Sequence, residues 1–445
     1  MQKIEAHNDL NQKLVKLGIC NKRYNEQLLS LTNAGFTSQQ ADKLIIRQSS
    51  TRSVLAVLEK YKLLIKNGFE FGDITRIAAH DGGARNIHAV IDSFHVLQNH
   101  GFSVVQIAEI AGTDGGSKNI EAVKSMYDNL TMVGFSKNQI TKMAGKIGGS
   151  KTLDTVIREF SRFKALNYSL KDIVKIAGHG SGSKNIEALA VTCDELKRLN
   201  FSPSQIAKIT GTPRGAKSIA ALLKDFDELV KLNFTHEQIV RITGNTGGSK
   251  NIRTLLCRYR ELSTLNFSNE QMVNIAGTNG GSDNIETVID SYQNLCFLGF
   301  SSEEIINLAS GQGGAANIGA VKSAFDELSQ MNFTIEHILA IACKFSGAKN
   351  IDVIIKYFRE LNEMGFSQDQ LVKIVSYNFG YKNIEAIKST YVELMAYLSI
   401  EQIVEVAANK YGYRNIEMVK NYYSGQKVPE FKGILFAHRV KALGF

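Results

Sequence analysis

Residues 102–134 read FSVVQIAEIAGTDGGSKNIEAVKSMYDNLTMVG, and variants of this stretch follow one another along the chain. An aromatic residue opens almost every copy, and each copy is numbered here from that residue as position 1. The interval is 33 residues from Phe36 to Phe366, after which Leu398 and Phe431 continue the series. Self-similarity at such a period is typical of repeat proteins built from one small unit. The intervening anchors are Phe69, Phe102, Phe135, Tyr168, Phe201, Phe234, Phe267, Phe300 and Phe333.

Each copy is predicted to form two helices. Position 2 is usually Ser or Thr with Gln or Glu three residues later, which is the spacing of an N-terminal capping box. Apolar residues at positions 6, 9 and 10 then follow helical spacing. A second helix is predicted after the glycine at position 15, ending at a left-handed Gly or Asn before the next anchor, as at Gly101, Gly134, Asn200 and Asn233. The capping pairs include Ser103–Gln106, Ser136–Gln139, Ser202–Gln205 and Ser268–Gln271.

One such hairpin cannot bury its own apolar face, whereas stacked copies can. The sequence therefore predicts an all-α protein, an α-solenoid of two-helix repeats. Eleven clear repeats span residues 69–430. Residues 1–68 contain a degenerate repeat starting at Phe36 and are expected to cap the N-terminal end. Residues 431–445 are expected to form a short C-terminal cap.

Composition excludes several classes of protein. Hydrophobic residues make up 44% and charged residues 21%, which is ordinary for a folded soluble chain. The chain lacks a long apolar run and a signal-peptide core, so neither a membrane partner nor Sec export is expected. The dispersed cysteines (Cys20, Cys193, Cys257, Cys296 and Cys343) favour buried reduced thiols over disulfides or a zinc site. No catalytic residue set recurs, so we expect no enzyme, small-molecule substrate, metal or cofactor.

Positions 12 and 13 vary between copies although the framework around them is uniform. A purely structural loop would repeat its chemistry, because each copy faces the same neighbours. The variation favours a row of loops that each contact something different. Position 12 is His80, Thr113, Lys146, His179, Thr212, Asn245, Thr278, Gly311, Lys344, Tyr377 and Asn409. Position 13 is Asp81, Asp114, Ile147, Gly180, Pro213, Thr246, Asn279, Gln312, Phe345, Asn378 and Lys410.

A glycine and a cation recur directly after this variable pair. The formal net charge is +9, and position 17 is basic in ten of twelve units, with Asp283 and Ala316 as exceptions. Glycine permits close backbone approach, and a helix N-terminus favours an anion. We therefore predict a repeated phosphate-binding element, to which basic residues at position 8 add charge. Its residues are Gly83, Arg85, Gly116, Lys118, Gly149, Lys151, Gly182, Lys184, Gly215, Lys217, Gly248, Lys250, Gly347, Lys349, Gly380, Lys382, Gly412 and Arg414, together with Arg52 of the degenerate unit.

The repeats resemble those of transcription activator-like (TAL) effectors, and more closely the shorter bacterial TAL-like proteins with 33-residue units. The similarity covers residues 36–430 and is carried by F-S-x-x-Q-I-x-x-I-A-G, the variable pair, then G-G-S-K-N-I-E-A-V, as in residues 102–123. It implies a right-handed superhelix in the major groove of double-stranded DNA. It further implies that position 13 contacts one base per repeat, position 12 braces the loop, and position 17 holds a phosphate.

Side-chain chemistry and the resemblance together give an expected target. Asp81 and Asp114 can accept from cytosine N4, while Asn279 and Asn378 can donate to a purine N7. Gly180 leaves space for a thymine methyl group. The resemblance assigns Ile147 to adenine, Lys410 to guanine and Thr246 to a purine, whereas Pro213, Gln312 and Phe345 stay unassigned. The expected site is 5′-C-C-A-T-n-R-G-n-n-R-G-3′, where R is a purine.

The chain departs from the family pattern at two places. It has no Trp, so Arg47 and Arg52 are expected to grip the DNA backbone where other members use an N-terminal tryptophan. Position 14, usually glycine, is Ser181, Arg214, Ser346, Phe379 and Tyr411 in five repeats. Those repeats are expected to approach the phosphate less closely.

Two other readings remain open: a protein-interaction solenoid and an RNA-binding repeat protein. The expected partner is double-stranded DNA, bound by a monomer that modulates transcription by occupancy. The expected location is the bacterial cytoplasm or nucleoid, or a host nucleus reached through a secretion system without a cleavable signal.

Overall fold

The computed structural model describes residues 21–46, 51–311 and 313–425. These residues form 25 helices and no strand, as regularly repeated helix pairs consistent with an α-solenoid. The all-α prediction is confirmed at this level. The chain divides into two compact units, Met1–Leu223 and Lys224–Phe445, and the division falls inside helix α14 (Gly215–Lys231).

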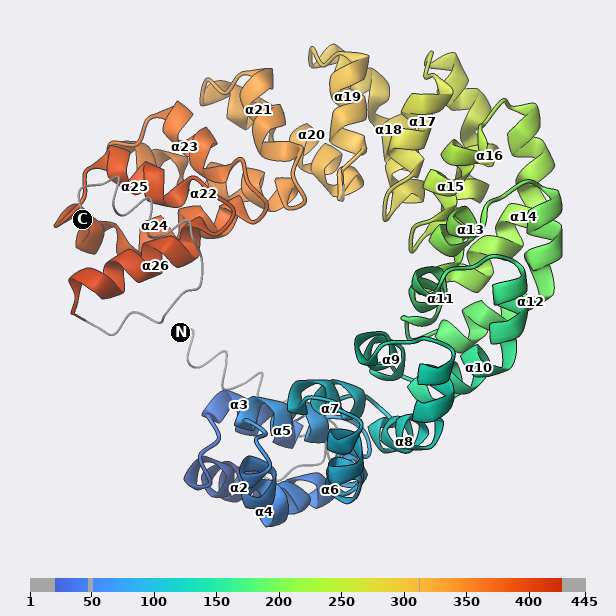
Figure 1. Cartoon of the computed structure of the whole chain (residues 1–445). Coiled ribbons are helices and arrows are strands. Elements are labelled where there is room, and N and C mark those ends of the chain that lie inside the picture. The colour runs from blue at the N-terminus through green and yellow to red at the C-terminus, as the bar shows by residue number, and fades with distance from the viewer. Residues whose placement is uncertain (1–20, 47–50, 312, 426–445) are drawn as a thin grey trace. The chain divides into compact units, whose positions relative to one another are not determined.

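In the first unit, short helices alternate with long ones along the chain (Figure 1). Long helices pack on the preceding long helix, and short helices pack on the preceding short helix, so the unit has two layers. The first three helices are α2 (Asn21–Asn33), α3 (Ser38–Ile46) and α4 (Thr51–Lys66). The short helices are α5 (Phe71–Ala78), α7 (Val104–Ala111), α9 (Lys137–Ala144), α11 (Leu170–Ala177) and α13 (Pro203–Thr210). The long helices are α6 (Gly83–Asn99), α8 (Gly116–Met132), α10 (Gly149–Ala165) and α12 (Gly182–Arg198).

The second unit repeats the same two-layer packing. Its short helices are α15 (His236–Thr243), α17 (Asn269–Ala276), α19 (Ser302–Ala309), α21 (Ile335–Ala342), α23 (Gln368–Val375) and α25 (Ile400–Ala407). Its long helices are α16 (Gly248–Thr264), α18 (Gly281–Phe297), α20 (Gly314–Gln330), α22 (Gly347–Glu363), α24 (Gly380–Met395) and α26 (Gly412–Tyr423).

The helix ends follow the sequence signals. Ser103 and Gln106 form the predicted capping box at the start of α7, and the same box opens α9, α13 and α17. The residues before the next anchor adopt the predicted left-handed conformation, with φ of 78° at Gly101 and 61° at Asn200. Both end signals are therefore confirmed for these helices.

The anchor residues form the core between the two layers. All described anchors from Phe36 to Leu398 are buried. Most of them contact an aromatic ring at position 26 of the long helix, as Phe102 contacts Tyr127 with ring centroids 5.6 Å apart. Edge-on ring pairs of this kind stabilise a core beyond their burial alone. Phe431 and the expected C-terminal cap, residues 431–445, lie outside the described residues.

The prediction of buried thiols is only partly right. Cys193 is buried, but Cys257 and Cys296 are exposed, and Cys343 is half-buried. The exposed pair lies on long helices whose buried face is occupied by other residues, such as Leu255 and Leu295. Burial raises the pKa of the Cys343 thiol to about 11. Cys20 lies outside the described residues. No described helix is both long and apolar enough to span a bilayer.

Candidate nucleic-acid interface

The position-15 glycine has a packing role inside each repeat. It begins the long helix and is buried in all eleven repeats. A Cβ added at Gly116 would lie 1.9 Å from the carbonyl oxygen of Ala111, and the other ten glycines face the same contact with the end of their short helix. Any larger residue would therefore separate the two helices.

The N–H groups of this glycine and of the next residue already form hydrogen bonds within the protein. The Gly116 N–H donates to the Thr113 carbonyl oxygen at 2.9 Å, and the equivalent bond forms in every repeat. The next N–H, that of Ser117, donates to the side chain of Asn86 at 2.8 Å. These two N–H groups at the helix N-terminus, where an anion site is predicted, are thus engaged within the protein. The N–H groups of Gly115 and Gly148 at position 14 have no acceptor among the residues the structure describes. The proposed phosphate contact therefore depends on position 14 and on the position-17 side chain.

The asparagine at position 18 holds the loop of the following repeat, a role that sequence reasoning missed. Asn185 is fully buried. Its Nδ2 donates to the carbonyl oxygens of Thr210 and Thr212 at 2.9 and 2.8 Å, and its Oδ1 accepts from the Ala216 N–H at 3.0 Å. Asn119, Asn251 and Asn350 make equivalent bonds to their following repeats. Recurrence of Asn directly after the position-17 cation is the sequence signal that could have revealed it.

Replacing Asn185 with Ala is expected to lower the free energy of unfolding by about 3 kcal/mol. The change leaves buried carbonyl and N–H groups without partners, and each such group costs about 1–3 kcal/mol. Urea unfolding measures the loss, and hydrogen exchange at Ala216 locates it. Asn129→Ala is the control, because Asn129 is exposed on α8. Equal stability of the two variants would contradict the assigned role of Asn185.

Position 13 lies exposed in every described repeat. The short helix ends at position 10, the long helix begins at position 15, and the variable residue lies in the intervening turn. The exposed residues are Asp81, Asp114, Ile147, Gly180, Pro213, Thr246, Asn279, Phe345, Asn378 and Lys410. Gln312 lies outside the described residues. These ten residues are of eight types and occupy one equivalent place in each repeat.

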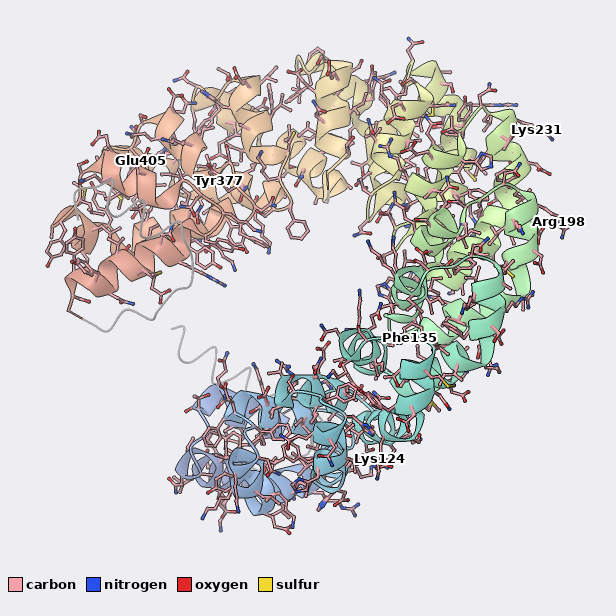
Figure 2. The ribbon with its side chains drawn as sticks, in the orientation of Figure 1. Lys124, Phe135, Arg198, Lys231, Tyr377 and Glu405 are labelled. Carbon is pink, nitrogen blue, oxygen red and sulfur yellow. The ribbon has the colours of Figure 1, made fainter. Side chains whose placement is uncertain are left out.

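Position 12 lies deeper than position 13, since Thr212 is buried and the other ten residues at this position are half-buried. Several of these side chains bond to neighbouring backbone. Asn245 donates to the carbonyl oxygens of Arg241 at 2.7 Å and of Gly277 in the next repeat at 2.8 Å. His179 Nε2 lies 2.9 Å from the Gly211 carbonyl oxygen, and burial lowers the pKa of this histidine. Tyr377, which is labelled in Figure 2, lies in the turn between the end of α23 and the start of α24.

Adjacent loops are linked through position 13. The Asp81 N–H donates to Oδ1 of Asp114 at 3.1 Å, and His80 Nδ1 lies 3.3 Å from the same oxygen. The Phe345 N–H donates to Asn378 in the same manner at 3.1 Å, as the Thr246 N–H does to Asn279 at 3.3 Å. Because an N–H requires an acceptor, this bond holds the amide oxygen toward the preceding loop. The amide Nδ2 is then the group left to donate outward.

The position-17 cations differ in whether an acidic side chain lies beside them, in the first unit as in the second. Lys382 is half-buried and all the others are exposed, Arg52 included. In the first unit Arg85, Lys118, Lys184 and Lys217 form no ion pair with a described residue, while Lys151 lies 3.4 Å from Glu187. In the second unit Lys250 binds Asp283, the position-17 residue of the next repeat, at 2.7 Å. The hydrogen bond from Lys250 lowers the pKa of Asp283. Arg47 lies outside the described residues.

Position 8 contributes less free charge than the sequence suggests. A Cβ built on Gly112 would meet Cγ of Arg76 at 2.6 Å, so this arginine stem packs against the next repeat. Lys373 binds Glu405 at 3.0 Å, and Arg241 binds Glu270. Residues at this position therefore help join neighbouring short helices.

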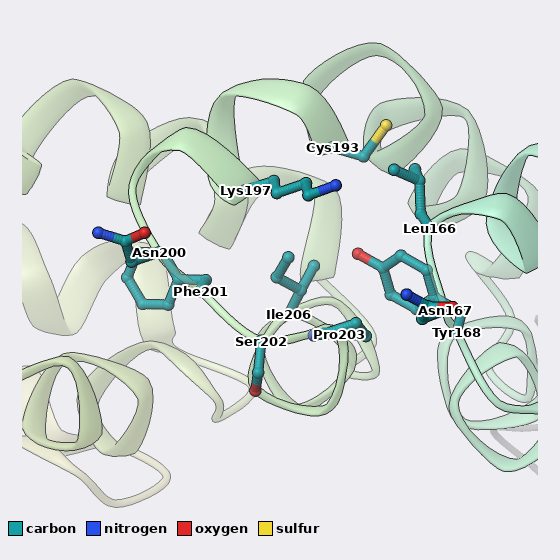
Figure 3. A pocket seen from close by; sticks show the side chains of 10 residues that line it. All are labelled: Leu166, Asn167, Tyr168, Cys193, Lys197, Asn200, Phe201, Ser202, Pro203 and Ile206. Carbon is teal, nitrogen blue, oxygen red and sulfur yellow. The ribbon is translucent and has the colours of Figure 1, made fainter.

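A pocket between two repeats of the first unit is a gap in packing. It has a volume of about 360 Å³ and lies beside Tyr168, whose hydroxyl is buried and has no hydrogen-bond partner within the described part of the chain (Figure 3). The position-26 residue here is Cys193, where most other repeats carry an aromatic ring. The smaller side chain accounts for the space. No cluster of His, Cys, Asp or Glu suited to a metal occurs among the described residues.

No protein-family model matches the chain, and no curated protein matches its sequence. The geometry of the loops, their charge and the sequence resemblance are therefore the grounds for a functional conclusion.

Proposed function

We propose that the chain binds double-stranded DNA sequence-specifically, reading one base per 33-residue repeat through position 13. The repeats would wrap as a right-handed superhelix in the major groove, with position-17 cations against the phosphates of one strand. The observation that carries this proposal is the pairing of a uniform buried framework with an exposed residue that differs from repeat to repeat. A surface of constant chemistry would suffice for non-specific binding.

The contacts at position 13 support the base assignments. With Oδ1 of Asp114 held by the preceding loop, its Oδ2 is the acceptor for cytosine N4. Asn279 and Asn378 have their amide oxygens held, which leaves Nδ2 to donate to a purine N7. Gly180 has no side chain and its turn is open, which suits a thymine methyl group.

Fluorescence anisotropy with the expected site, 5′-C-C-A-T-n-R-G-n-n-R-G-3′, inside a longer duplex tests the proposal. We expect at least about tenfold tighter binding than to a scrambled duplex, since each wrong base pair costs about 1–3 kcal/mol. Single-stranded RNA of the matching sequence is the second competitor, and two salt concentrations separate phosphate contacts from base contacts. Equal binding to both duplexes would refute base reading. Binding to neither would favour a protein-interaction solenoid.

A further inference from the structure

The loops of the last three described repeats carry aromatic rings at position 13, 14 or 16, whereas the earlier clear repeats have no aromatic residue at these positions. Position 14 is Phe379 and Tyr411, and position 16 is Tyr381 and Tyr413, whereas the repeat from Phe102 has Gly and Ser there. Phe345 and Phe379 lie 5.7 Å apart between ring centroids, and Phe379 lies 6.4 Å from Tyr381. These three rings therefore form a cluster across two neighbouring loops.

Three of these rings are exposed, and Tyr381 and Tyr413 are half-buried. Phe345 is 50% exposed, Phe379 36% and Tyr411 43%. Phe379 also has a φ of 66°, a left-handed conformation that side chains other than glycine rarely adopt. Five other repeats place glycine in that conformation at position 14. A strained and exposed ring contributes little to the stability of the fold, and such strain is typical of binding sites.

Cations lie over the same rings. Lys382 Nζ is 5.4 Å from the Phe379 ring centroid and 5.3 Å from that of Tyr413. Lys349 lies 5.4 Å from Tyr381, and Arg414 lies 5.5 Å from Tyr411. None of these three cations, nor Lys410, forms an ion pair with a residue that the structure describes. Their charge is available to an anionic partner.

We infer that this aromatic–basic surface binds single-stranded nucleic acid. The surface comprises Phe345, Lys349, Phe379, Tyr381, Lys382, Lys410, Tyr411, Tyr413 and Arg414. Exposed rings offer faces on which unpaired bases stack, and the cations beside them suit the intervening phosphates. Bases in a duplex are already stacked on one another, so exposed rings gain little from paired DNA. Capture of an unpaired strand next to a duplex rests on the proposed function, whereas binding of a free single strand does not.

The test uses the full chain and a short single strand containing 2-aminopurine, made as DNA and as RNA. Stacking on the rings quenches this base, and its excitation avoids protein signal because the chain has no Trp. We expect quenching by the wild type and a loss of affinity of about fivefold or more for each ring removed in the triple variant Phe345→Ala, Phe379→Gly, Tyr411→Ala. The glycine also relieves the strained backbone, so folding is preserved.

Phe297→Ala is the matched control, because Phe297 is 88% exposed on α18 and lies outside this surface. Equal affinity of the triple variant and the wild type would overturn the inference, as would a failure of the wild type to bind either strand. Binding of anionic lipid vesicles or of an acidic peptide in place of the single strand would also overturn it. Comparison of the DNA and RNA strands identifies the sugar preferred. The affinity of the wild type for duplex DNA is measured in parallel. If the wild type binds the single strand but not the duplex, the proposed function is refuted and this inference stands.

Discussion

Replacing Arg85, Lys118, Lys184 and Lys217 together with Gln is expected to weaken binding to every duplex by about three orders of magnitude at about 0.1 M salt. Each cation that neutralises a phosphate releases counterions and contributes a slope of about −0.9 to log K against log salt. All four side chains are exposed, and none is neutralised by an ion pair with a described residue. The slope should therefore become shallower by about 3.6. Anisotropy titrations over a salt series measure both quantities.

The control variant removes the same charge from the opposite ends of the long helices. Lys164, Lys197, Arg198 and Lys231 are exposed at or near the last turns of α10, α12 and α14, and Figure 2 labels the last two. Their replacement with Gln should change the slope of log K against log salt by less than about 0.9, the value for one phosphate contact. An equal loss in the two variants would show that the loop edge does not hold the phosphates.

Lys250 provides an internal comparison. Its ammonium group is bound by Asp283, so Lys250→Gln should have a smaller effect than substitution of Lys118. Asp283→Ala should release Lys250 and steepen the slope by about 0.9. The contribution of each position-17 cation to the salt-dependent affinity thus depends on whether an acidic side chain neutralises it.

Asp114→Asn is expected to move the preference at one base from cytosine to a purine. The Asp81 N–H can still donate to Oδ1, while the group facing outward changes from an acceptor to the Nδ2 donor. Asn279 already accepts the same bond from the preceding loop. We expect the substitution to reverse a discrimination of about 1–3 kcal/mol without altering the other positions. Competition among four duplexes that differ only at this base measures the change.

Asp128→Asn is the charge-matched control for this prediction, because Asp128 is exposed on α8, away from the loop. It should leave the base preference unchanged. If both variants changed the affinity for all four duplexes equally, Asp114 would act through charge alone and would not read a base.

The repeating core could be predicted because its signals are local. A capping pair such as Ser103–Gln106, and a left-handed Asn200, depend only on residues within one helix or its ends. The burial of Phe102 follows because every anchor has the same neighbours in a stacked array. These features are visible in one 33-residue stretch of sequence.

Features that depend on the next repeat were harder to predict. The bonds of Asn185 reach a loop about 27 residues later, and the pairing of Lys250 with Asp283 joins side chains 33 residues apart. The sequence predicts a phosphate-binding role for the position-15 glycine. Its packing role is visible only in three dimensions, because it depends on how close the end of the short helix lies to the glycine Cα. The site residues were recognised from their variation, but their contacts with one another were not.

The position-18 asparagine limits where an array of such repeats can be cut and rejoined, by recombination or by protein engineering. A transplanted repeat brings its own position-13 residue, yet the support beneath its loop comes from whichever repeat precedes it. Thr152 shows the difference, because its hydroxyl donates to the Gly148 carbonyl oxygen of its own loop, while Asn119 reaches forward to the loop at Lys146. The transferable module therefore runs from the long helix of one repeat to the loop of the next. An insertion cut at the anchor residue separates a loop from its support.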